Sequence, residues 1–360
     1  MNKSIITATV LFVVSLFATA QTDEQLLKHA RELHSKILTL DTHADTPMEF
    51  YQDSTINIGK RNSKIKVDLV KMQEGGLDAV FFVVFQDQGS QTDSAFARAY
   101  NESKKIFAAI HREAERNSDK AQLVTSHAEA LKAKEQGKRA IFIGVENGYC
   151  LGKNISAIEE FYNLGARYIT LCHMINSEIC KSSTDKSDDY GLTDFGKEVV
   201  REMNRIGMLI DVSHISDQSV RDVAAYSKAP IIASHSNVRV LRDYSRNLSD
   251  ELIRLIAEKG GVIQVGIYTG FLKPRSEGKA TVADVVNHID HIVKLVGIDH
   301  VGFGSDFDGG GDVIGCEDAS GVINITVELL RRGYTDEDIE KFWGLNFLRV
   351  MEQVKMSASD

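Results

Sequence analysis

Short apolar runs recur along the chain, and longer segments with helical periodicity separate them. Eight of these runs are predicted to be strands, because they are nearly continuous in apolar residues and end at polar residues or glycines. They cover residues 37–45, 77–85, 139–148, 166–173, 208–214, 231–237, 262–268 and 300–309. Continuous rather than alternating apolar positions are typical of parallel strands that are buried on both faces.

Helical segments lie between the predicted strands. Thr193, Ser216, Ser249 and Thr281 each precede a helical pattern and are predicted N-caps, and Gly207 is a predicted helix end. Helices are also predicted over residues 23–35, 64–74, 93–117, 126–136, 157–164, 321–332 and 336–350. Strands that alternate with helices in this way predict one large α/β domain, a (β/α)₈ barrel of the TIM type, rather than a doubly wound sheet.

Side chains that bind metals or transfer protons stand at the ends of six of the eight predicted strands. In a (β/α)₈ barrel the functional groups lie at the C-terminal ends of the strands, where they face one another. His43 and Asp45 are two residues apart, so on a strand both side chains point to the same face. The six ends carry His43 with Asp45, then Glu146, His173, His214, His235 and Asp306.

These residue types favour a catalytic metal centre over a structural one. Neutral imidazole and carboxylate ligands without thiolates suit catalytic zinc. A pair of metal ions needs about five ligand residues and a carboxylate that bridges the ions, whereas one ion would leave several of these side chains without a role. Such a pair holds a bridging water as hydroxide and polarises a carbonyl or phosphoryl oxygen, so the pattern predicts metal-assisted hydrolysis.

The motifs at the strand ends resemble those of the renal (membrane) dipeptidase family. They are HAD at 43–45, GVENG at 144–148, DVSH at 211–214, SHSN at 234–237 and GSDFDG at 304–309. The segment YGLTDFG at 190–196 matches as well, so the resemblance runs in order over essentially the whole chain after its N-terminal leader. It implies a zinc-dependent dipeptidase of the metal-dependent hydrolase type, with two Zn²⁺ ions per chain and a dipeptide as substrate.

The resemblance also implies which residues hold the metal. His43 and Asp45 would hold the first zinc ion, and His214 and His235 would hold the second. Glu146 would bridge both ions and is thereby also part of the catalytic machinery.

Three further residues receive catalytic or substrate-binding roles from the resemblance. His173 would contact the substrate carbonyl oxygen, and Arg246 would pair with the C-terminal carboxylate, as a planar guanidinium does in bidentate fashion. Asp306 would relay the proton, and Asp308 is the alternative for that role. Acceptance of a D-residue at the C-terminal position is an expectation from the family alone.

The first twenty residues have the pattern of a signal peptide. Lys3 gives a positive start, residues 5–17 are nearly all apolar, and Ala18-Thr19-Ala20 is a small-residue cleavage pattern. The prediction is an exported, periplasmic bacterial protein with its barrel domain at 21–360. The polar tail at 355–360 lacks the hydrophobic signal of a lipid anchor, so no stable membrane attachment is expected.

The net charge and the cysteine count bear on the binding partners and on disulfide bonds. The formal net charge of −9 argues against nucleic acid as a partner. Four cysteines allow three full disulfide pairings, which the sequence does not separate, and none has the CxxC spacing of a zinc site. A homodimer is the assembly that the resemblance implies.

Two other functions are compatible with parts of this pattern. A related binuclear amidohydrolase that acts on cyclic amides, lactones or phosphoesters would usually carry HxH after the first strand, and this chain carries HxD at 43–45. A periplasmic protein that binds peptides without cleaving them would not need five metal ligands.

Overall fold

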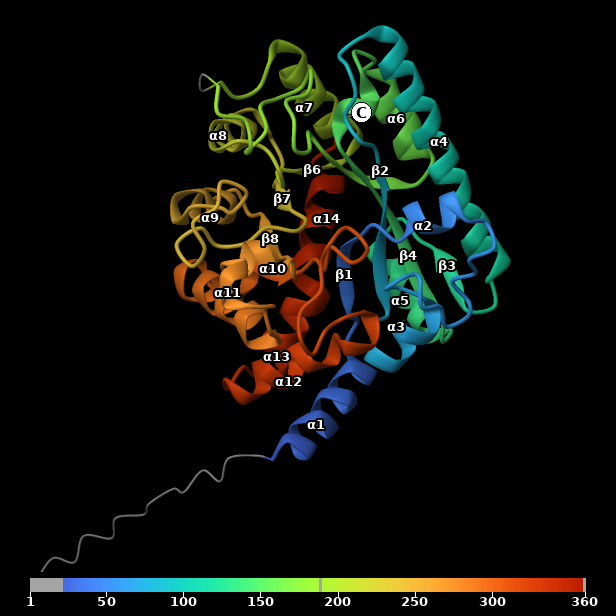
Figure 1. Cartoon of the computed structure of the whole chain (residues 1–360), viewed down its shortest axis with the longest axis vertical. Coiled ribbons are helices and arrows are strands. Elements are labelled where there is room, and N and C mark those ends of the chain that lie inside the picture. The colour runs from blue at the N-terminus through green and yellow to red at the C-terminus, as the bar shows by residue number, and fades with distance from the viewer. Residues whose placement is uncertain (1–21, 188–189, 359–360) are drawn as a thin grey trace, which may run out of the picture.

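The computed structural model describes residues 22–187 and 190–358 (Figure 1). The predicted leader at 1–20 lies outside these residues and stays a prediction. Among the described helices, none combines the length and the apolar character that a membrane span requires. All four cysteines are buried and carry free thiols.

Eight parallel strands form the barrel, and each of them matches one of the predicted runs. They follow one another in the order β1-β2-β4-β5-β6-β7-β8-β9. Their bounds are Leu40–Ala44 (β1), Ala79–Phe85 (β2), Arg139–Glu146 (β4), Ala166–Thr170 (β5), Leu209–Asp211 (β6), Ile232–Ala233 (β7), Val262–Val265 (β8) and Val301–Phe303 (β9). A short strand, β3 (Ala121–Leu123), pairs with β4 outside this order and was not predicted.

Backbone hydrogen bonds close the barrel between its first and last strands. Asp306 N donates to His43 O at 2.9 Å, and Asp45 N donates to Phe307 O at 2.8 Å. The closing contacts therefore involve the residues on which the predicted site depends.

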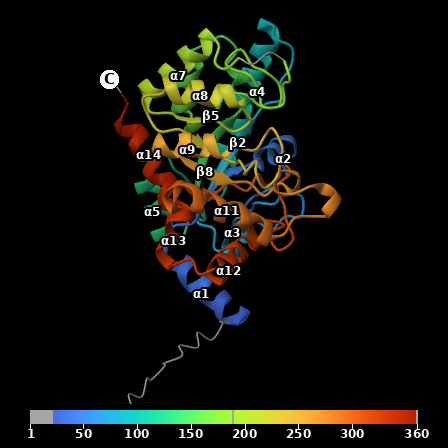
Figure 2. The same cartoon turned by 90° about the vertical axis from the view of Figure 1, so that its left-hand side faces the viewer.

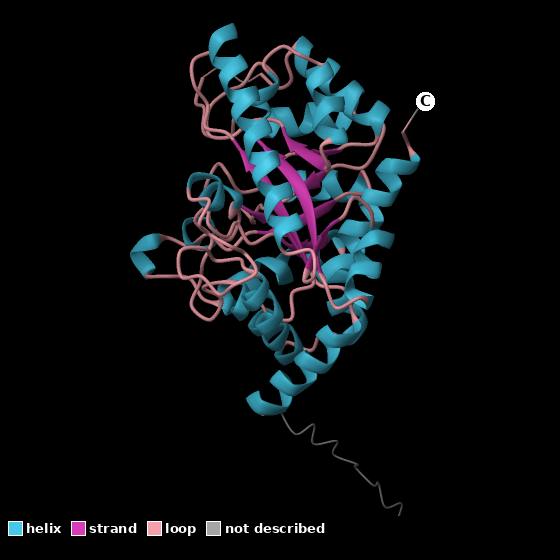
Figure 3. Ribbon diagram, turned by 90° about the vertical axis from the view of Figure 1, so that its right-hand side faces the viewer, coloured by secondary structure: helices cyan, strands magenta, loops and turns pink. Residues whose placement is uncertain are grey.

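Helices surround the strands on the outside of the barrel (Figures 2 and 3). Their bounds are Asp23–Lys36 (α1), Pro47–Gln52 (α2), Leu69–Gly75 (α3), Asp93–Arg116 (α4), His127–Glu135 (α5), Ser156–Asn163 (α6), Asp194–Ile206 (α7), Asp217–Tyr226 (α8), Asp250–Glu258 (α9), Thr269–Leu272 (α10), Val282–Val296 (α11), Ile323–Arg331 (α12), Asp336–Glu340 (α13) and Asn346–Met356 (α14). The predicted N-caps Thr193, Ser216, Ser249 and Thr281 are confirmed, because each side chain accepts a backbone N–H three residues further on.

Two predicted helix bounds were wrong. The helix predicted at 64–74 begins only at Leu69, because the Asp68 side chain caps it by accepting from Val70 N and Lys71 N. Lys66 lies before it in extended chain and donates its backbone N–H to Asp308. At the C-terminus the helix predicted at 336–350 continues through a π-helical segment, Lys341–Leu345, to Met356.

An aromatic layer fills the barrel interior next to the site. The ring of Phe81 packs on Phe142 (4.8 Å between centroids), on Tyr168 (5.2 Å) and on Phe347 of α14 (5.2 Å). Tyr168 lies flat across Gly144, where a Cβ atom would come within 2.2 Å of the tyrosine ring. Glycine is therefore required at position 144 for Tyr168 to reach the mouth of the barrel.

A buried histidine outside the site is held in its neutral form. His34 of α1 donates from Nδ1 to the Gly76 carbonyl (3.1 Å) and accepts at Nε2 from the Thr326 hydroxyl (2.6 Å), which itself accepts from Trp343 Nε1 (2.7 Å). Burial lowers the pKa of His34 from 6.5 to about 4.

We expect this histidine to make stability depend on pH. Between pH 6.5 and about 4, His34 is protonated in the unfolded chain but stays neutral in the folded chain. The free energy of unfolding therefore falls as the pH drops through this window. From pH 7 to pH 5 the loss is about 2 kcal/mol for this one group. Urea unfolding of wild type and His34→Gln at both pH values measures it. Equal pH dependence in the two proteins would contradict the assignment.

Candidate active site

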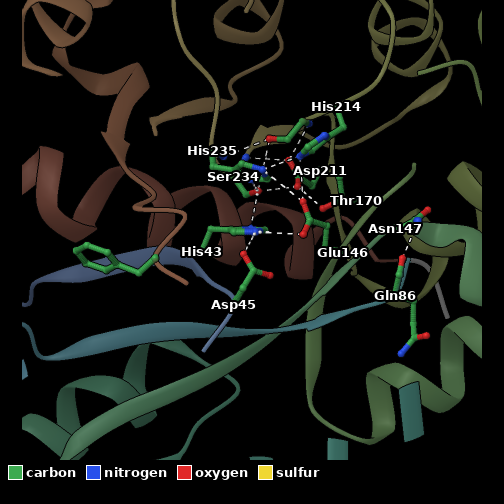
Figure 4. A network of polar contacts seen from close by, with 12 residues as sticks. His43, Asp45, Gln86, Glu146, Asn147, Thr170, Asp211, His214, Ser234 and His235 are labelled. Carbon is green, nitrogen blue, oxygen red and sulfur yellow. Dashed lines mark hydrogen bonds and ion pairs between the residues drawn. The ribbon is translucent and has the colours of Figure 1, made fainter. Parts of the chain in front are cut away.

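All seven side chains predicted at strand ends lie at one mouth of the barrel. Figure 4 shows five of them: His43, Asp45, Glu146, His214 and His235. His43 belongs to β1, Asp45 follows it directly, and Glu146 is the last residue of β4. The other four stand in the loops that follow their strands, because the strands are shorter than predicted: His173 after β5, His214 after β6, His235 after β7 and Asp306 after β9. His173 and Asp306 are half-buried, and the other five side chains are buried.

Glu146 is the centre of the arrangement. Its Oε2 lies 3.5 Å from His43 Nε2, whereas its Oε1 lies 3.0 Å from His214 Nε2 and 3.4 Å from His235 Nε2. The two carboxylate oxygens thus face different histidines, as a bridging ligand requires.

Three overlapping sets of side chains bring their ligand atoms within 4.8 Å of one another. They are His43, Glu146 and His235; then Glu146, His173 and His214; and then His43, Asp45 and Asp306. Glu146 and His43 each belong to two sets. The structure therefore brings the predicted ligands together, and it places His43 close to His235, with 3.8 Å between ring centroids.

The donor set fits metal ions. His43 Nε2 and Asp45 Oδ1 are buried and have no hydrogen-bond partner among the described residues. Buried polar atoms are normally satisfied, and imidazole nitrogens and carboxylate oxygens are the ligands of catalytic zinc. These residues would hold the metal.

Crowding of the carboxylates at this mouth shifts their pKa values in opposite directions. Burial and the Glu146 charge raise the pKa of Asp45, and burial and Asp45 hold the pKa of Asp306 well above its ordinary range. Burial also acts to raise the pKa of Glu146, but the surrounding histidines, His43 first, hold it well below its ordinary range. Buried like charges cannot all ionise without a compensating cation.

The pKa values of the histidines are also shifted in opposite directions. Burial lowers the pKa of His214 and His235 well below the ordinary value, so both are neutral, which is the form that binds a metal. Burial also acts to lower the pKa of His43, but the neighbouring carboxylates of Glu146 and Asp45 have a larger effect. They hold the pKa of His43 well above the ordinary value. Metal binding at His43 would therefore release a proton.

Backbone strain marks several residues of the mouth. His214 (φ 70°) and Asp306 (φ 62°) both have positive φ, as do Asn147 and Asp308. Positive φ costs free energy for residues other than glycine, and such residues cluster at functional sites. Sequence reasoning missed this feature, because aspartate, asparagine and histidine at loop starts do not reveal their backbone angles.

Gly309 allows the acidic residues to approach one another. A Cβ atom at this position would lie 2.1 Å from Asp45 Oδ2 and 2.4 Å from Asp306 Oδ1. Both carboxylates therefore press against the bare backbone of the loop that follows β9, and a side chain here would displace one of them.

Asp306 and Asp308 have different surroundings. Asp306 lies within the ligand set of His43 and Asp45. Asp308 instead accepts from the Thr46 hydroxyl (2.5 Å) and from Lys66 N (2.9 Å), so its oxygens are engaged by the loop around them. This geometry supports the prediction that Asp306, rather than Asp308, faces the reacting groups.

Arg246 is a buried cation near the metal ligands. Its Nη1 donates to Ser236 Oγ (2.8 Å) and its Nη2 donates to the His235 carbonyl (2.8 Å). Its Nε has no partner, and no described carboxylate forms an ion pair with it. The guanidinium lies over the Phe271 ring, 5.6 Å from its centroid. The charges of Asp211, Glu146 and Asp306 act on the guanidinium without forming an ion pair with it, so it can bind an anion directly.

A cavity of about 460 Å³ opens above the ligands. Glu146, His173, His214 and Asp306 are among the residues that line it, as are aromatic side chains such as Phe271. The space is of the size that small-molecule sites have.

Comparison with known proteins identifies the family. The model of the membrane dipeptidase family (peptidase family M19) matches residues 27–360, which is nearly the whole chain. The chain belongs to this family. The M19 match confirms the predicted family and the predicted enzyme class, and it argues against the peptide-binding alternative.

Curated relatives agree with the M19 assignment. The dipeptidase tcpJ of Claviceps purpurea is 33% identical over 295 residues, which are 80% of this chain and 69% of that protein. An uncharacterized dipeptidase of Schizosaccharomyces pombe is 32% identical over 345 residues, which are 90% of this chain and 82% of that protein. The chain is thus a dipeptidase of the M19 family.

Solved structures confirm the barrel fold. The probable dipeptidase PvdM of Pseudomonas aeruginosa superposes with a TM-score of 0.85 at 29% identity, covering 93% of this chain and all of that one. A metallo peptidase of Rhodobacter sphaeroides, liganded with a phosphinate mimic of L-Ala-D-Ala, superposes with a TM-score of 0.81 at 23% identity, covering 88% of this chain and 99% of that one.

Proposed function

We propose that this M19 dipeptidase is zinc-dependent and holds two Zn²⁺ ions at the barrel mouth. The observation that carries the proposal is the position of Glu146, whose two oxygens face His43 on one side and His214 and His235 on the other. In this proposal His43 and Asp45 hold one ion, and His214 and His235 hold the other. Zinc supplies Lewis acidity, which polarises a carbonyl and lowers the pKa of a water ligand.

The residues of the chain itself perform the remaining steps. Arg246 binds the C-terminal carboxylate of the dipeptide, which supplies the counter-ion that this guanidinium lacks. His173 donates to the carbonyl oxygen as negative charge develops there, which favours the transition state. Asp306 takes the proton of the attacking water and returns it to the leaving amine.

Metal removal tests the proposed function. Chelation should abolish hydrolysis of dipeptides, and added zinc should restore it, because the ligand set cannot polarise a carbonyl without a cation. The measurement is steady-state hydrolysis of a dipeptide panel together with metal analysis of the purified chain, with about two zinc per chain expected. Full activity in metal-free protein, or failure of zinc-loaded protein on the whole panel, would refute the proposal.

The panel should include C-terminal L- and D-residues. The ligand of the Rhodobacter sphaeroides structure mimics a dipeptide that ends in D-Ala, and we extend acceptance of a C-terminal D-residue to this chain as part of the proposal. Cyclic amides and lactones belong in the same panel, because preferred cleavage of these would favour the amidohydrolase alternative.

Arg246→Ala should raise KM for dipeptides on the order of 10²-fold with a smaller change in kcat, because a charged hydrogen-bonded contact to the substrate is lost. Arg242→Ala, in the same loop, is the matched control, since Arg242 contacts Gly270 O and Asp243 O instead. Steady-state kinetics of both variants check the prediction. If KM is the same in Arg246→Ala as in wild type, another group binds the carboxylate.

Export to the periplasm and a homodimeric state complete the proposal. The apolar leader with its small-residue cleavage pattern supports export. N-terminal sequencing of protein from the periplasmic fraction tests cleavage after Ala20, and light scattering of the purified chain tests the dimer.

A further inference from the structure

Asp211, at the end of β6, is a fully buried carboxylate beneath the metal ligands (Figure 4). Its Oδ1 accepts from Ser213 N (3.0 Å) and Ser234 N (2.8 Å). Its Oδ2 accepts from Thr170 Oγ1 (2.5 Å) and Ser234 Oγ (2.7 Å). With four donors directed at it, this side chain acts only as an acceptor, as an ionised carboxylate does.

The hydroxyl of Ser234 connects Asp211 to the rings of His235 and His43 by hydrogen bonds. Since its proton goes to Asp211 Oδ2, its oxygen can only accept from the nearby ring nitrogens, His235 Nδ1 at 2.9 Å and His43 Nδ1 at 3.3 Å. His235 therefore carries its proton on Nδ1. Its Nε2 therefore carries the lone pair, and this atom lies 2.8 Å from His214 Nε2 and 3.4 Å from Glu146 Oε1, among the other ligand atoms.

The hydroxyl of Tyr168 also accepts a hydrogen bond from a ring nitrogen, that of His43. Its hydroxyl donates to the Thr42 carbonyl (3.1 Å), so its oxygen accepts from His43 Nδ1, 2.9 Å away. His43 Nε2 is thereby left facing Glu146 and Asp45. His43 of β1 and His235 after β7 are thus both oriented through Nδ1, by two separate hydroxyl groups.

We infer that Asp211 and Ser234 are positioning residues that fix His235 as the Nδ1–H tautomer and so set the metal affinity of the site. Partners of this kind orient a ligating histidine and raise its basicity, and their loss typically costs 10- to 100-fold in metal affinity. The inference rests on the proposed metal centre.

Ser234→Ala is the decisive variant, and Ser236→Ala is its matched control. Ser236 lies two residues away in the same segment, but its hydroxyl accepts from Arg246 and does not contact Asp211. Zinc affinity, measured on the full chain by competition with a chromophoric chelator, should fall about 10- to 100-fold in Ser234→Ala. It should be unchanged in Ser236→Ala, and Ser234→Thr, which keeps the hydroxyl, should retain most of the affinity.

Two outcomes would overturn the inference. One is zinc affinity in Ser234→Ala equal to that of wild type. The other is an NMR signal of zinc-loaded wild type that shows His235 Nδ1 without a proton, and this measurement stands even if Ser234→Ala does not fold. A wild-type chain that binds no zinc would instead refute the proposed function.

A second observation concerns Asp87, which lines the cavity two residues beyond the end of β2. Its side chain is exposed, and it forms no hydrogen bond or ion pair with the described residues. The other carboxylates that line the cavity are engaged, either in the ligand sets or, for Asp308, by Thr46 and Lys66. No lysine or arginine is among the described residues that line the cavity.

Strand order places Asp87 opposite Arg246. β2 and β7, which precede these residues, are four positions apart in the order of eight strands and therefore lie on opposite sides of the mouth. If Arg246 binds the substrate carboxylate, as proposed, a dipeptide would extend its N-terminal residue across the mouth toward Asp87. The α-ammonium group, two bonds from the scissile carbonyl, stays near the buried ligands, whereas a long side chain reaches the exposed rim.

We propose that Asp87 is a specificity residue that favours dipeptides with a cationic N-terminal side chain. The aliphatic stem of a lysine would lie along Met48 and Phe85, which line the same cavity, and its ammonium group would meet the carboxylate. This proposal deepens the proposed function and depends on it.

The ratio of kcat/KM for Lys-Ala to that for Leu-Ala tests the proposal. Asp87→Asn should lower this ratio about 3-fold, as expected for an exposed ion pair, and added salt should lower it in wild type. Asp243→Asn, an exposed aspartate that does not line the cavity, is the control. An unchanged ratio, or an equal loss for both substrates, would overturn the proposal, whereas inactivity of wild type on every dipeptide would refute the proposed function.

Discussion

Glu146→Gln should lower kcat/KM for dipeptides by at least about 10³-fold and reduce the zinc content of the purified chain. Glu146 is within 3.5 Å of three histidine nitrogens, and a neutral amide would offer only one oxygen and no charge to the two proposed ions. Metal polarisation contributes several kcal/mol to transition-state stabilisation, and about 4 kcal/mol corresponds to this factor. Steady-state kinetics and mass-spectrometric metal analysis give both quantities.

Glu113→Gln is a matched control for this variant. Glu113 is also a buried glutamate, but it lies on α4 and pairs with Arg112 and Arg116. Its replacement should leave the metal content unchanged. Two zinc ions and full activity in Glu146→Gln would mean that another group joins the two halves of the centre.

Asp306→Asn should lower kcat by about 10²- to 10⁴-fold while the chain keeps its zinc, because general acid–base catalysis accounts for a factor of this size. The asparagine has nearly the same shape, so Gly309 can still pack against it, but it cannot accept and return a proton. Kinetics as a function of pH should show that the limb due to this group has disappeared.

Asp308→Asn is the control that tests whether the loss of kcat is specific to Asp306 or follows from removing any carboxylate of this loop. Asp308 is held by Thr46 and Lys66, so its replacement should mainly lower the free energy of unfolding, by about 1 kcal/mol for a weakened hydrogen bond. If Asp308→Asn loses more kcat than Asp306→Asn, the two roles must be exchanged. If Asp306→Asn loses zinc, Asp306 is a ligand.

The sequence allowed the barrel and the seven strand-end residues to be predicted, because both leave local signals. A buried parallel strand such as β2 is a continuous apolar run, and a histidine or carboxylate at the end of such a run stands out. β3 was missed because its three residues, Ala121–Leu123, are too few to show a pattern. The predicted helix began too early, at residue 64, because in the sequence Asp68 cannot be told from a polar residue inside a helix, whereas in the structure it is the N-cap of α3.

The partners of the ligands could not be predicted in the same way. Asp211 and Ser234 stood in quoted motifs, but nothing in the sequence distinguishes a carboxylate that accepts four hydrogen bonds from one that faces solvent. Tyr168 read as an ordinary strand residue, since its contact with His43 depends on the missing side chain of Gly144, which lies on another strand. Such contacts join residues far apart in the chain and are decided only by packing.

We expect the site to form late in folding, because the contacts that complete it join β1 to the segment just after β9. Ser305 Oγ donates to His43 O at 3.0 Å across 262 positions of the sequence, so the first ligands meet Asp306 only when nearly the whole chain has been made. Contacts between such distant residues form slowly, because a long loop must be closed before they contribute. If the chain is exported unfolded, as proposed, it would acquire the proposed zinc ions only on the far side of the membrane, and bound zinc would report that folding is complete.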